Sequence, residues 1–286
     1  MIIVTGASGH LGSTIIERLL ERVPAADVGV SVRDVDKARS LADRGVRVRA
    51  GDFTEPSTLD HAFEGADQVL VVSAAIRGGG AFDANSAAID AAQRAGASRI
   101  LYTSHQAASP DSLFPPQTVH HATEQHLAAT GLPFTALRNG FYANAIGIHL
   151  DAALATGQIV TPEDGPVSWT AHADLAEAAA IALAEPATFD GISAPLTASV
   201  ALDLGQVAKI LSGIVGREIT HVTVDDDTWR ASAIERGLPP MVADFSLGMF
   251  QAAHRGEFDV VDRTLADVIG HPTTSVETVL RELLRR

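Results

Sequence analysis

Cysteine is absent from the 286-residue chain. Its absence excludes disulfides, thiolate metal sites, iron–sulfur clusters and cysteine nucleophiles. Basic residues are also scarce, because 21 arginines and lysines stand against 35 acidic residues and give a formal net charge of -14. Such a charge repels phosphate backbones and anionic lipid surfaces, so we expect no nucleic-acid or membrane partner.

Long apolar runs are lacking as well. No segment approaches the roughly 18 consecutive apolar residues that indicate a membrane span. The beginning of the chain, Met1–Thr5, has neither the basic region nor the longer apolar stretch of a secretory signal. The sequence therefore predicts a cytoplasmic protein. Its 46% of hydrophobic residues can fill the core of one large α/β domain, or of a dinucleotide-binding domain with a smaller lobe.

Short β-branched runs alternate with helical patterns through the first half of the chain. The expected strands are Ile2–Thr5, Val28–Val32, Val46–Val48, Val69–Val72, Ile100–Thr103 and Phe134–Leu137. After the first strand, Leu11, Ile15 and Leu19 recur on one helical face. Alternation at this spacing indicates βαβ units, and right-handed crossovers then favour an α/β fold with a doubly wound, Rossmann-type parallel sheet.

The pattern changes near Asp190, after which helical segments dominate. We therefore expect a Rossmann-type domain over residues 1–190 and a smaller C-terminal α/β lobe over residues 191–286. The smaller lobe should lie over the carboxyl ends of the strands, on the substrate side. Because no long linker separates the two parts, we expect them to pack as one unit.

A glycine-rich turn joins the first strand to the first helix. Its residues are Gly6, Ala7, Ser8, Gly9, His10, Leu11 and Gly12. A diphosphate needs close backbone approach and N–H donors at a helix N-terminus, and side chains at the glycines would block it. The G-x-x-G-x-x-G spacing alone also fits a bare tight turn. Its position at the start of a βαβ unit is what predicts dinucleotide binding.

Positive side chains follow the second predicted strand, about 20 residues beyond the turn, where a dinucleotide's adenosine ribose is expected. Arg33 ends that strand and Lys37 lies one helical turn further on. Both suit a 2′-phosphate, which favours NADP(H) over NAD(H), although Arg33 could also be a solvated charge. Asp34 could bind an unmodified ribose, but a helix follows at once, so a helix N-cap is the favoured interpretation.

Motifs along nearly the whole chain resemble the NmrA-like branch of the atypical short-chain dehydrogenases and reductases, especially its quinone and triphenylmethane reductases. The segments that carry the resemblance are Val4–Gly12, Val32–Asp34, Gly51–Phe53, Tyr102–Ser104, Thr123–Glu124, Leu137–Tyr142 and Ile269–Thr274. The last two are distinctive, whereas the glycine turn is shared more widely. The resemblance implies a Rossmann fold, an NADP(H) cofactor and oxidoreductase activity on a small molecule.

The resemblance also implies roles for particular residues. The glycine turn and Arg33 would bind the diphosphate and the 2′-phosphate, while Asp52 and Phe53 would lie beside the adenine. Residues expected along the nicotinamide and the substrate pocket are Ser73, Ala74, Ala75, Thr103, Ser104, Arg138, Asn139, Gly140, Phe141 and Tyr142.

The chain departs from related families at two catalytic positions. Neither Tyr102 nor Tyr142 begins a Tyr-x-x-x-Lys motif, in which the lysine would hold the ribose and lower the tyrosine pKa. Many NmrA-like relatives keep a lysine directly after Thr-Glu, where this chain has Gln125. The amide of Gln125 can still hydrogen-bond ribose hydroxyls without supplying a charge. Cofactor binding should tolerate this change better than fast turnover does.

Two residues are candidates for contact with the substrate. Tyr142 could donate a hydrogen bond to a carbonyl group, or could simply pack beneath the small lobe. His105 follows a strand end, where ligands gather in open α/β sheets, or could face solvent from a loop. Hydride transfer to a quinone relies mainly on positioning, so no acid–base residue is obligatory. His120 and Glu124 are one helical turn apart and could share a metal, but without further ligands ordinary helix residues are favoured, so we expect no metal.

The favoured hypothesis is an NADPH-dependent reductase of a quinone or a similar conjugated, electron-poor small molecule. One alternative is an NADP(H)-sensing regulator of the NmrA type with a protein partner, toward which Gln125 points slightly. Another is a tailoring enzyme of secondary metabolism. A homodimer is compatible with each of them. Gly78–Gly80 could form a lid beside the cofactor or a tolerant connection.

Overall fold

The computed structural model describes residues 1–76 and 79–285, so Gly78 of the predicted lid or connection lies outside them. Within that part of the chain, every helix is too short or too polar to traverse a lipid bilayer.

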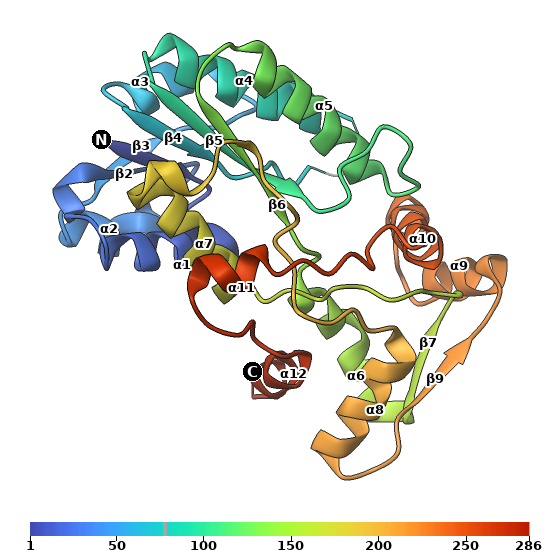
Figure 1. Cartoon of the computed structure of the whole chain (residues 1–286). Helices are drawn as coiled ribbons and strands as arrows, with labels where there is room; N and C mark the ends of the chain where they lie inside the picture. The colour runs from blue at the N-terminus through green and yellow to red at the C-terminus, as the bar shows by residue number, and fades with distance from the viewer. Residues whose placement is uncertain (77–78, 286) are drawn as a thin grey trace.

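A seven-stranded sheet forms the centre of the larger part of the molecule (Figure 1). Its strands are β1 (Ile2–Thr5), β2 (Val28–Val32), β3 (Arg47–Ala50), β4 (Gln68–Val71), β5 (Arg99–His105), β6 (Phe134–Asn139) and β8 (Gly191–Ile192). They lie in the order β3-β2-β1-β4-β5-β6-β8, and each neighbouring pair is parallel. The predicted Rossmann-type sheet is confirmed.

Helices cover both faces of this sheet (Figure 1). One layer holds α1 (His10–Leu20), α2 (Arg39–Asp43) and α7 (His172–Ala184), and the other α3 (Leu59–Phe63), α4 (Ala81–Arg94) and α5 (Pro115–Ala129). Successive strand residues point to opposite layers, as the period of two requires. Val4 and Leu70 join the core beneath α1 and α7, whereas Ile3 and Val69 join the core beneath α3 to α5. Burial on both faces explains the near-continuous apolar runs of β1 and β4.

The predicted strands agree with the structure except at some ends. β1 and β2 have their predicted bounds, whereas β5 and β6 extend to His105 and Asn139. These last residues stay in the sheet because they pair with each other. The two-residue strand β8 gave no sequence signal. Short 3-10 helices occur at η1 (Ala25–Asp27), η2 (Val35–Ala38), η3 (Pro56–Thr58), η4 (Ala143–His149) and η5 (Pro186–Thr188).

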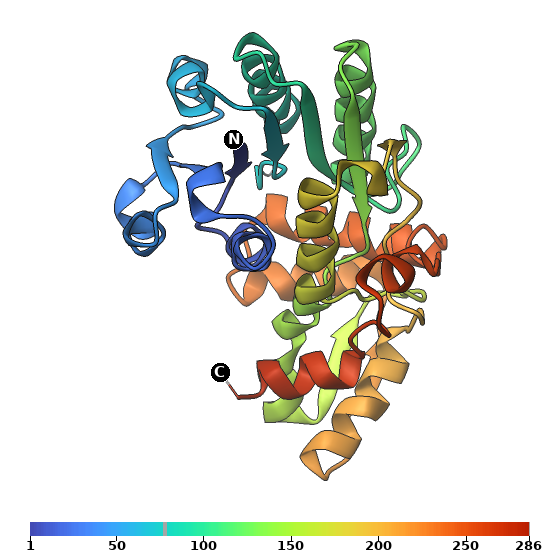
Figure 2. The ribbon, with the colours of Figure 1, turned by 60° about the vertical axis from the view of Figure 1, so that its left-hand side comes forward.

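A smaller lobe lies at the carboxyl ends of the strands, below the main sheet in both views (Figures 1 and 2). It contains the parallel strands β7 (Gln158–Thr161) and β9 (Thr220–Thr223). Its helices are α6 (Leu150–Thr156), α8 (Leu204–Val215), α9 (Asp226–Glu235), α10 (Pro240–His254) and α12 (Val276–Leu283). A separate core with Phe141, Trp169, Phe250 and Phe258 holds it together.

The chain passes between the two parts more than once. β7 precedes residue 190 yet pairs with β9, whereas β8 follows that point yet pairs with β6. Helix α11 (Thr264–Ile269) also returns to the larger part, where Leu265 and Ile269 join the core with α7. The division at residue 190 stays a prediction, and these crossings lock the two parts together.

Candidate functional site

The glycine turn at the end of β1 has the geometry of a diphosphate cradle. Gly6 adopts a φ of +63°, in the left-handed region that favours glycine. Gly9 caps α1 without a side-chain hydrogen bond, so the first N–H groups of the helix remain for a ligand. A Cβ at Gly12 would lie 2.3 Å from the Gly6 carbonyl oxygen. The backbone therefore fits an anionic group that side chains would exclude.

The other residues of the turn divide by the direction of their side chains. Ala7 and Leu11 are buried in the core beneath α1, so only their backbone groups can meet a ligand. Ser8 and His10 are exposed and are the side chains of the turn that a cofactor can contact.

Charged residues surround the end of β2, where the 2′-phosphate is expected. The Asp34 carboxylate accepts a hydrogen bond from the Asp36 N–H at 3.1 Å and lies 3.8 Å from the Lys37 ammonium. Asp34 is therefore the N-cap of η2, which confirms the favoured interpretation of this residue. Arg33 is exposed at the strand end, and the Asp52 carboxylate lies within its electrostatic reach.

Asp52 forms a compact turn beyond β3. Its carboxylate accepts hydrogen bonds from the N–H and the hydroxyl of Thr54, both at 2.8 Å. These bonds, with a smaller contribution from Arg33, hold the pKa of Asp52 below its usual value, so this side chain is a carboxylate at neutral pH. The neighbouring Phe53 is partly buried against the core beneath α3 and α4.

We expect Arg33→Ala to weaken NADPH binding by about 10- to 100-fold and NADH binding by less than about twofold, since only NADPH brings a 2′-phosphate to this side chain. Fluorescence titration of both cofactors measures the two dissociation constants. Arg39→Ala is the matched control, because the Arg39 guanidinium is instead paired with Asp36 at 2.8 Å. Equal losses for NADPH and NADH would remove Arg33 from the 2′-phosphate site.

The segment after β4 is fixed by side chains from three other elements. The backbone N–H groups of Val72, Ser73 and Ala74 all donate to side-chain oxygens. The acceptors, at 2.8 to 2.9 Å, are Thr5 of β1, Thr103 of β5 and Asn85 of α4. The edge along which the nicotinamide is expected is thus rigid. Thr5 and Asn85 were missed in the sequence, because a threonine or asparagine at such positions has no distinctive spacing.

A buried ion pair joins α5 to the ends of β5 and β6. The fully buried Glu124 carboxylate accepts hydrogen bonds from Ser104 at 2.6 Å and from the Arg138 guanidinium at 2.7 and 2.9 Å. The pair links the Thr-Glu and Leu-Arg-Asn-Gly motifs. In it, the Glu124 carboxylate neutralises much of the positive charge of the Arg138 guanidinium. Gln125, the next residue, is exposed and makes no side-chain hydrogen bond to any residue of 1–76 or 79–285. Cofactor contact by Arg138 and Gln125 stays a prediction.

His105 lies among aromatic rings at the end of β5. Its ring centroid is 5.5 Å from that of Phe141, 5.8 Å from that of Phe258 and 6.1 Å from that of His120. Its Nδ1 accepts a 3.3 Å hydrogen bond from the Ala107 N–H, which places the proton of the neutral ring on Nε2. Burial, reinforced by His120, lowers the pKa of His105 well below its usual value, so the ring is neutral at pH 7.

His120 takes part in a polar network. Its Nδ1 lies 2.8 Å from the Tyr102 hydroxyl, which accepts a 3.2 Å hydrogen bond from Asn85. Through Asn85 this network reaches the backbone after β4. Within the described ranges, no group of three or more histidine, aspartate or glutamate side chains is placed to hold a metal ion.

Tyr142 lies against the ring of His172, with centroids 4.3 Å apart. Burial raises the pKa of Tyr142 against the opposing effect of the Asn139 side chain, so the hydroxyl keeps its proton at neutral pH. Gly140 allows the chain to approach this site, since a Cβ there would lie 2.1 Å from the Thr170 hydroxyl oxygen. The structure thus accommodates both interpretations of Tyr142, as a packed ring and as a hydrogen-bond donor.

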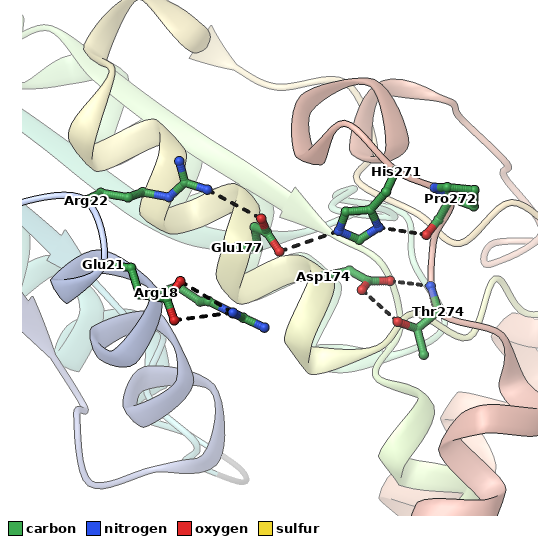
Figure 3. Close-up of polar contacts among 8 residues, drawn as sticks. All are labelled: Arg18, Glu21, Arg22, Asp174, Glu177, His271, Pro272 and Thr274. Carbon is green, nitrogen blue, oxygen red and sulfur yellow. Dashed lines mark hydrogen bonds and ion pairs between the residues drawn. The ribbon is translucent and has the colours of Figure 1, made fainter.

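The distinctive Ile269–Thr274 segment fastens the C-terminal part of the chain to α7 (Figure 3). Asp174 accepts hydrogen bonds from the N–H and the hydroxyl of Thr274, at 2.7 and 2.8 Å. One turn further along α7, Glu177 lies 3.5 Å from His271 and 3.4 Å from Arg22 of the segment after α1. The segment therefore supports the helix that packs on α1, behind the glycine turn.

The predicted site residues follow the carboxyl ends of β1 to β6, the edge where ligands bind in open α/β sheets. A family model described as NAD(P)H-binding matches residues 6–186. Quinone oxidoreductase 2 of Escherichia coli is 34% identical over 279 residues, which is 96% of each chain.

Solved structures agree with this likeness over nearly the whole fold. The Escherichia coli NADPH-dependent quinone oxidoreductase complexed with NADPH superposes with a TM-score of 0.94 at 33% identity, covering 99% of this chain and all of that one. The triphenylmethane reductase of a Citrobacter species, complexed with NADP(H), superposes with a TM-score of 0.93 at 31% identity, again covering 99% of this chain and all of that one. The chain therefore belongs to the NAD(P)H-binding family, in its NmrA-like branch.

Proposed function

We propose that this protein is an NADPH-dependent reductase of quinones or similar conjugated, electron-poor small molecules. The observation that carries the proposal is the placement of a glycine cradle for the cofactor diphosphate on the same sheet edge as two neutral hydrogen-bond donors, Tyr142 and His105. The names of the relatives point the same way, since they act on a quinone and on a triphenylmethane dye. No charged catalytic pair is required for that chemistry.

The cofactor would lie along the carboxyl ends of the strands. The backbone of the glycine turn would hold the diphosphate, and Arg33 with Lys37 would hold the 2′-phosphate. Asp52 and Phe53 would border the adenine. Ser73, Ala74 and Ala75 would follow the path toward the nicotinamide, with Thr103 and Ser104 beside them. When bound, NADPH supplies a hydride to the substrate.

The protein's own part in the reaction is to orient the substrate and to stabilise its reduced form. Reduction of a quinone to a hydroquinone by a hydride also consumes one proton. Tyr142 and the Nε2–H of His105 would donate hydrogen bonds to a carbonyl oxygen as negative charge develops there. Phe141 and Phe258, which are buried beside His105, would keep water away from its ring.

The experiment that tests the proposal is NADPH oxidation by the purified protein against a panel of quinones, with NADH in parallel. We expect quinone-dependent turnover that is at least about 10-fold more efficient with NADPH than with NADH, given the positive charge at Arg33 and Lys37. A triphenylmethane dye extends the panel to another conjugated acceptor. Tight NADPH binding with no turnover on any of the acceptors would contradict the reductase proposal and favour a sensor with a protein partner. A homodimer stays a prediction.

A further inference from the structure

We propose that His172 is a positioning residue that couples the occupied glycine turn to Tyr142, through a column of three rings formed by His10, His172 and Tyr142. The inference rests on the proposed function, because it assigns a way in which the cofactor prepares the substrate side of the same site. Nothing in the sequence pattern joins these residues, which come from α1, from the start of α7 and from the segment after β6.

The three rings are in continuous contact. The His10 and His172 centroids are 4.6 Å apart at an interplanar angle of 65°, in an edge-to-face arrangement. The His172 and Tyr142 centroids are 4.3 Å apart at 40°. Such distances give direct van der Waals contact, so a ring pressed toward its neighbour must move that neighbour. His172 is thus the link between a turn that binds the cofactor and a side chain proposed to meet the substrate.

The middle ring is held from its edge as well as from its faces. His172 Nδ1 lies 2.7 Å from the Asn144 side-chain oxygen. The backbone on either side is fixed too, because Thr170 donates to the Phe141 carbonyl at 2.7 Å and accepts from the Ala143 N–H at 2.9 Å. His172 therefore cannot turn away from Tyr142 when His10 moves.

The two helices that carry the histidines of the column pack side by side. α7 lies beside α1 (Figure 2), and their side chains share one buried core. Both helices begin at a histidine of the column, His10 for α1 and His172 for α7. His10 is exposed in the glycine turn, so its ring is not needed to fill the core. A diphosphate bound to the first N–H groups of α1 would meet this ring directly.

The consequence for Tyr142 is a position that depends on the cofactor. In the free protein the column can adjust at its exposed end, at His10. With the diphosphate seated, His10 is confined, and the confinement passes through His172 to Tyr142. The hydroxyl of Tyr142 then has one preferred position beside Asn139. Cofactor binding would thus precede productive substrate binding, and the loss of His172 should affect turnover more than cofactor affinity.

The first test follows Tyr142 without measuring activity. The chain has two tyrosines, so labelling with 3-fluorotyrosine gives two fluorine resonances, which Tyr102→Phe assigns. The probe is 2′-phospho-ADP-ribose, which carries the cofactor phosphates but no nicotinamide ring that could touch Tyr142. We expect it to move the Tyr142 resonance in the unmodified protein. The movement should be lost in His10→Ala and in His172→Ala, and kept in His172→Phe, which retains a ring in the column.

The controls separate coupling from general damage. His254→Ala removes an exposed imidazole outside the column and should keep the full response. Each variant is first checked for the native circular dichroism spectrum and for binding of the probe. A Tyr142 resonance that does not respond in the unmodified protein, or responds equally in His172→Ala, would overturn the coupling.

The second test is kinetic. With the acceptor that the unmodified protein reduces best, we expect His172→Ala to lower kcat by about 10-fold while the KM for NADPH changes by less than about threefold. His172→Phe should recover most of that loss. An unchanged kcat in His172→Ala, or a defect confined to the KM for NADPH, would contradict the assignment. If the unmodified protein reduces no acceptor, the proposed function fails, while the fluorine measurement still decides the fate of the ring column.

Discussion

Gly12→Ala is expected to weaken NADPH binding by at least about 100-fold, which corresponds to about 2.8 kcal/mol of binding free energy. The added Cβ would lie 2.3 Å from the oxygen and 2.7 Å from the carbonyl carbon of Gly6. Both are backbone atoms of the cradle itself, so no flexible side chain can give way. To relieve the overlap, the turn must move away from α1, and its N–H groups then no longer converge on a diphosphate.

Isothermal titration with NADPH measures this loss, and circular dichroism establishes that the variant is folded. Gly213→Ala in α8 is the matched control, because the Cβ it would add has no described atom within 4 Å apart from its chain neighbours and the backbone of its own helix. Should Gly12→Ala fail to fold, Gly9→Ala provides a milder probe, since its Cβ would lie 3.3 Å from the Gly6 oxygen. Native affinity in a folded Gly12→Ala protein would remove the cradle from the cofactor site.

The second large effect expected is a loss of stability in mild acid. Burial lowers the pKa of His120 to about 4 and, with a contribution from His221, that of His149 to about 4, against an ordinary value of 6.5. Below pH 6.5 the unfolded chain binds protons at these rings while the folded protein does not, until the pH nears 4. Stability therefore falls as the pH drops through this window. At pH 5 each ring lowers the free energy of unfolding by about 2 kcal/mol relative to neutral pH, so the pair lowers it by about 4 kcal/mol.

Urea denaturation at pH 7.5 and pH 5.0 measures the difference in unfolding free energy. In His149→Gln, whose side chain stays neutral at both values, the difference should shrink by about 2 kcal/mol. His254→Gln alters an exposed histidine and should leave it unchanged. Burial raises the pKa of Asp164, so this carboxyl adds stability as the pH falls, opposite to the effect of the two histidines. An identical pH dependence in His149→Gln and the unmodified protein would show that His149 is not protonated differently on unfolding.

Much of the fold is encoded in short stretches of sequence. The bounds of β1 and β2 follow from apolar residues between polar ends, because strands of a covered parallel sheet are buried on both faces. The glycine turn is equally local, since its backbone conformation depends on residues within one turn. The pairing of β7 with β9, by contrast, joins segments on either side of residue 190. The periodicity of one segment carries no information about the strand with which it pairs.

The sequence by itself determined the Rossmann core, the cofactor class and the strand ends along which the predicted site residues lie, because each depends on local patterns or on motifs shared with relatives. Only the tertiary structure decided which side chains meet there. Glu124 with Arg138, Thr5 with Val72, and His172 between His10 and Tyr142 are contacts between segments distant in the chain. Such contacts arise when helices and strands pack, and their free energy depends on burial and geometry that no single segment contains.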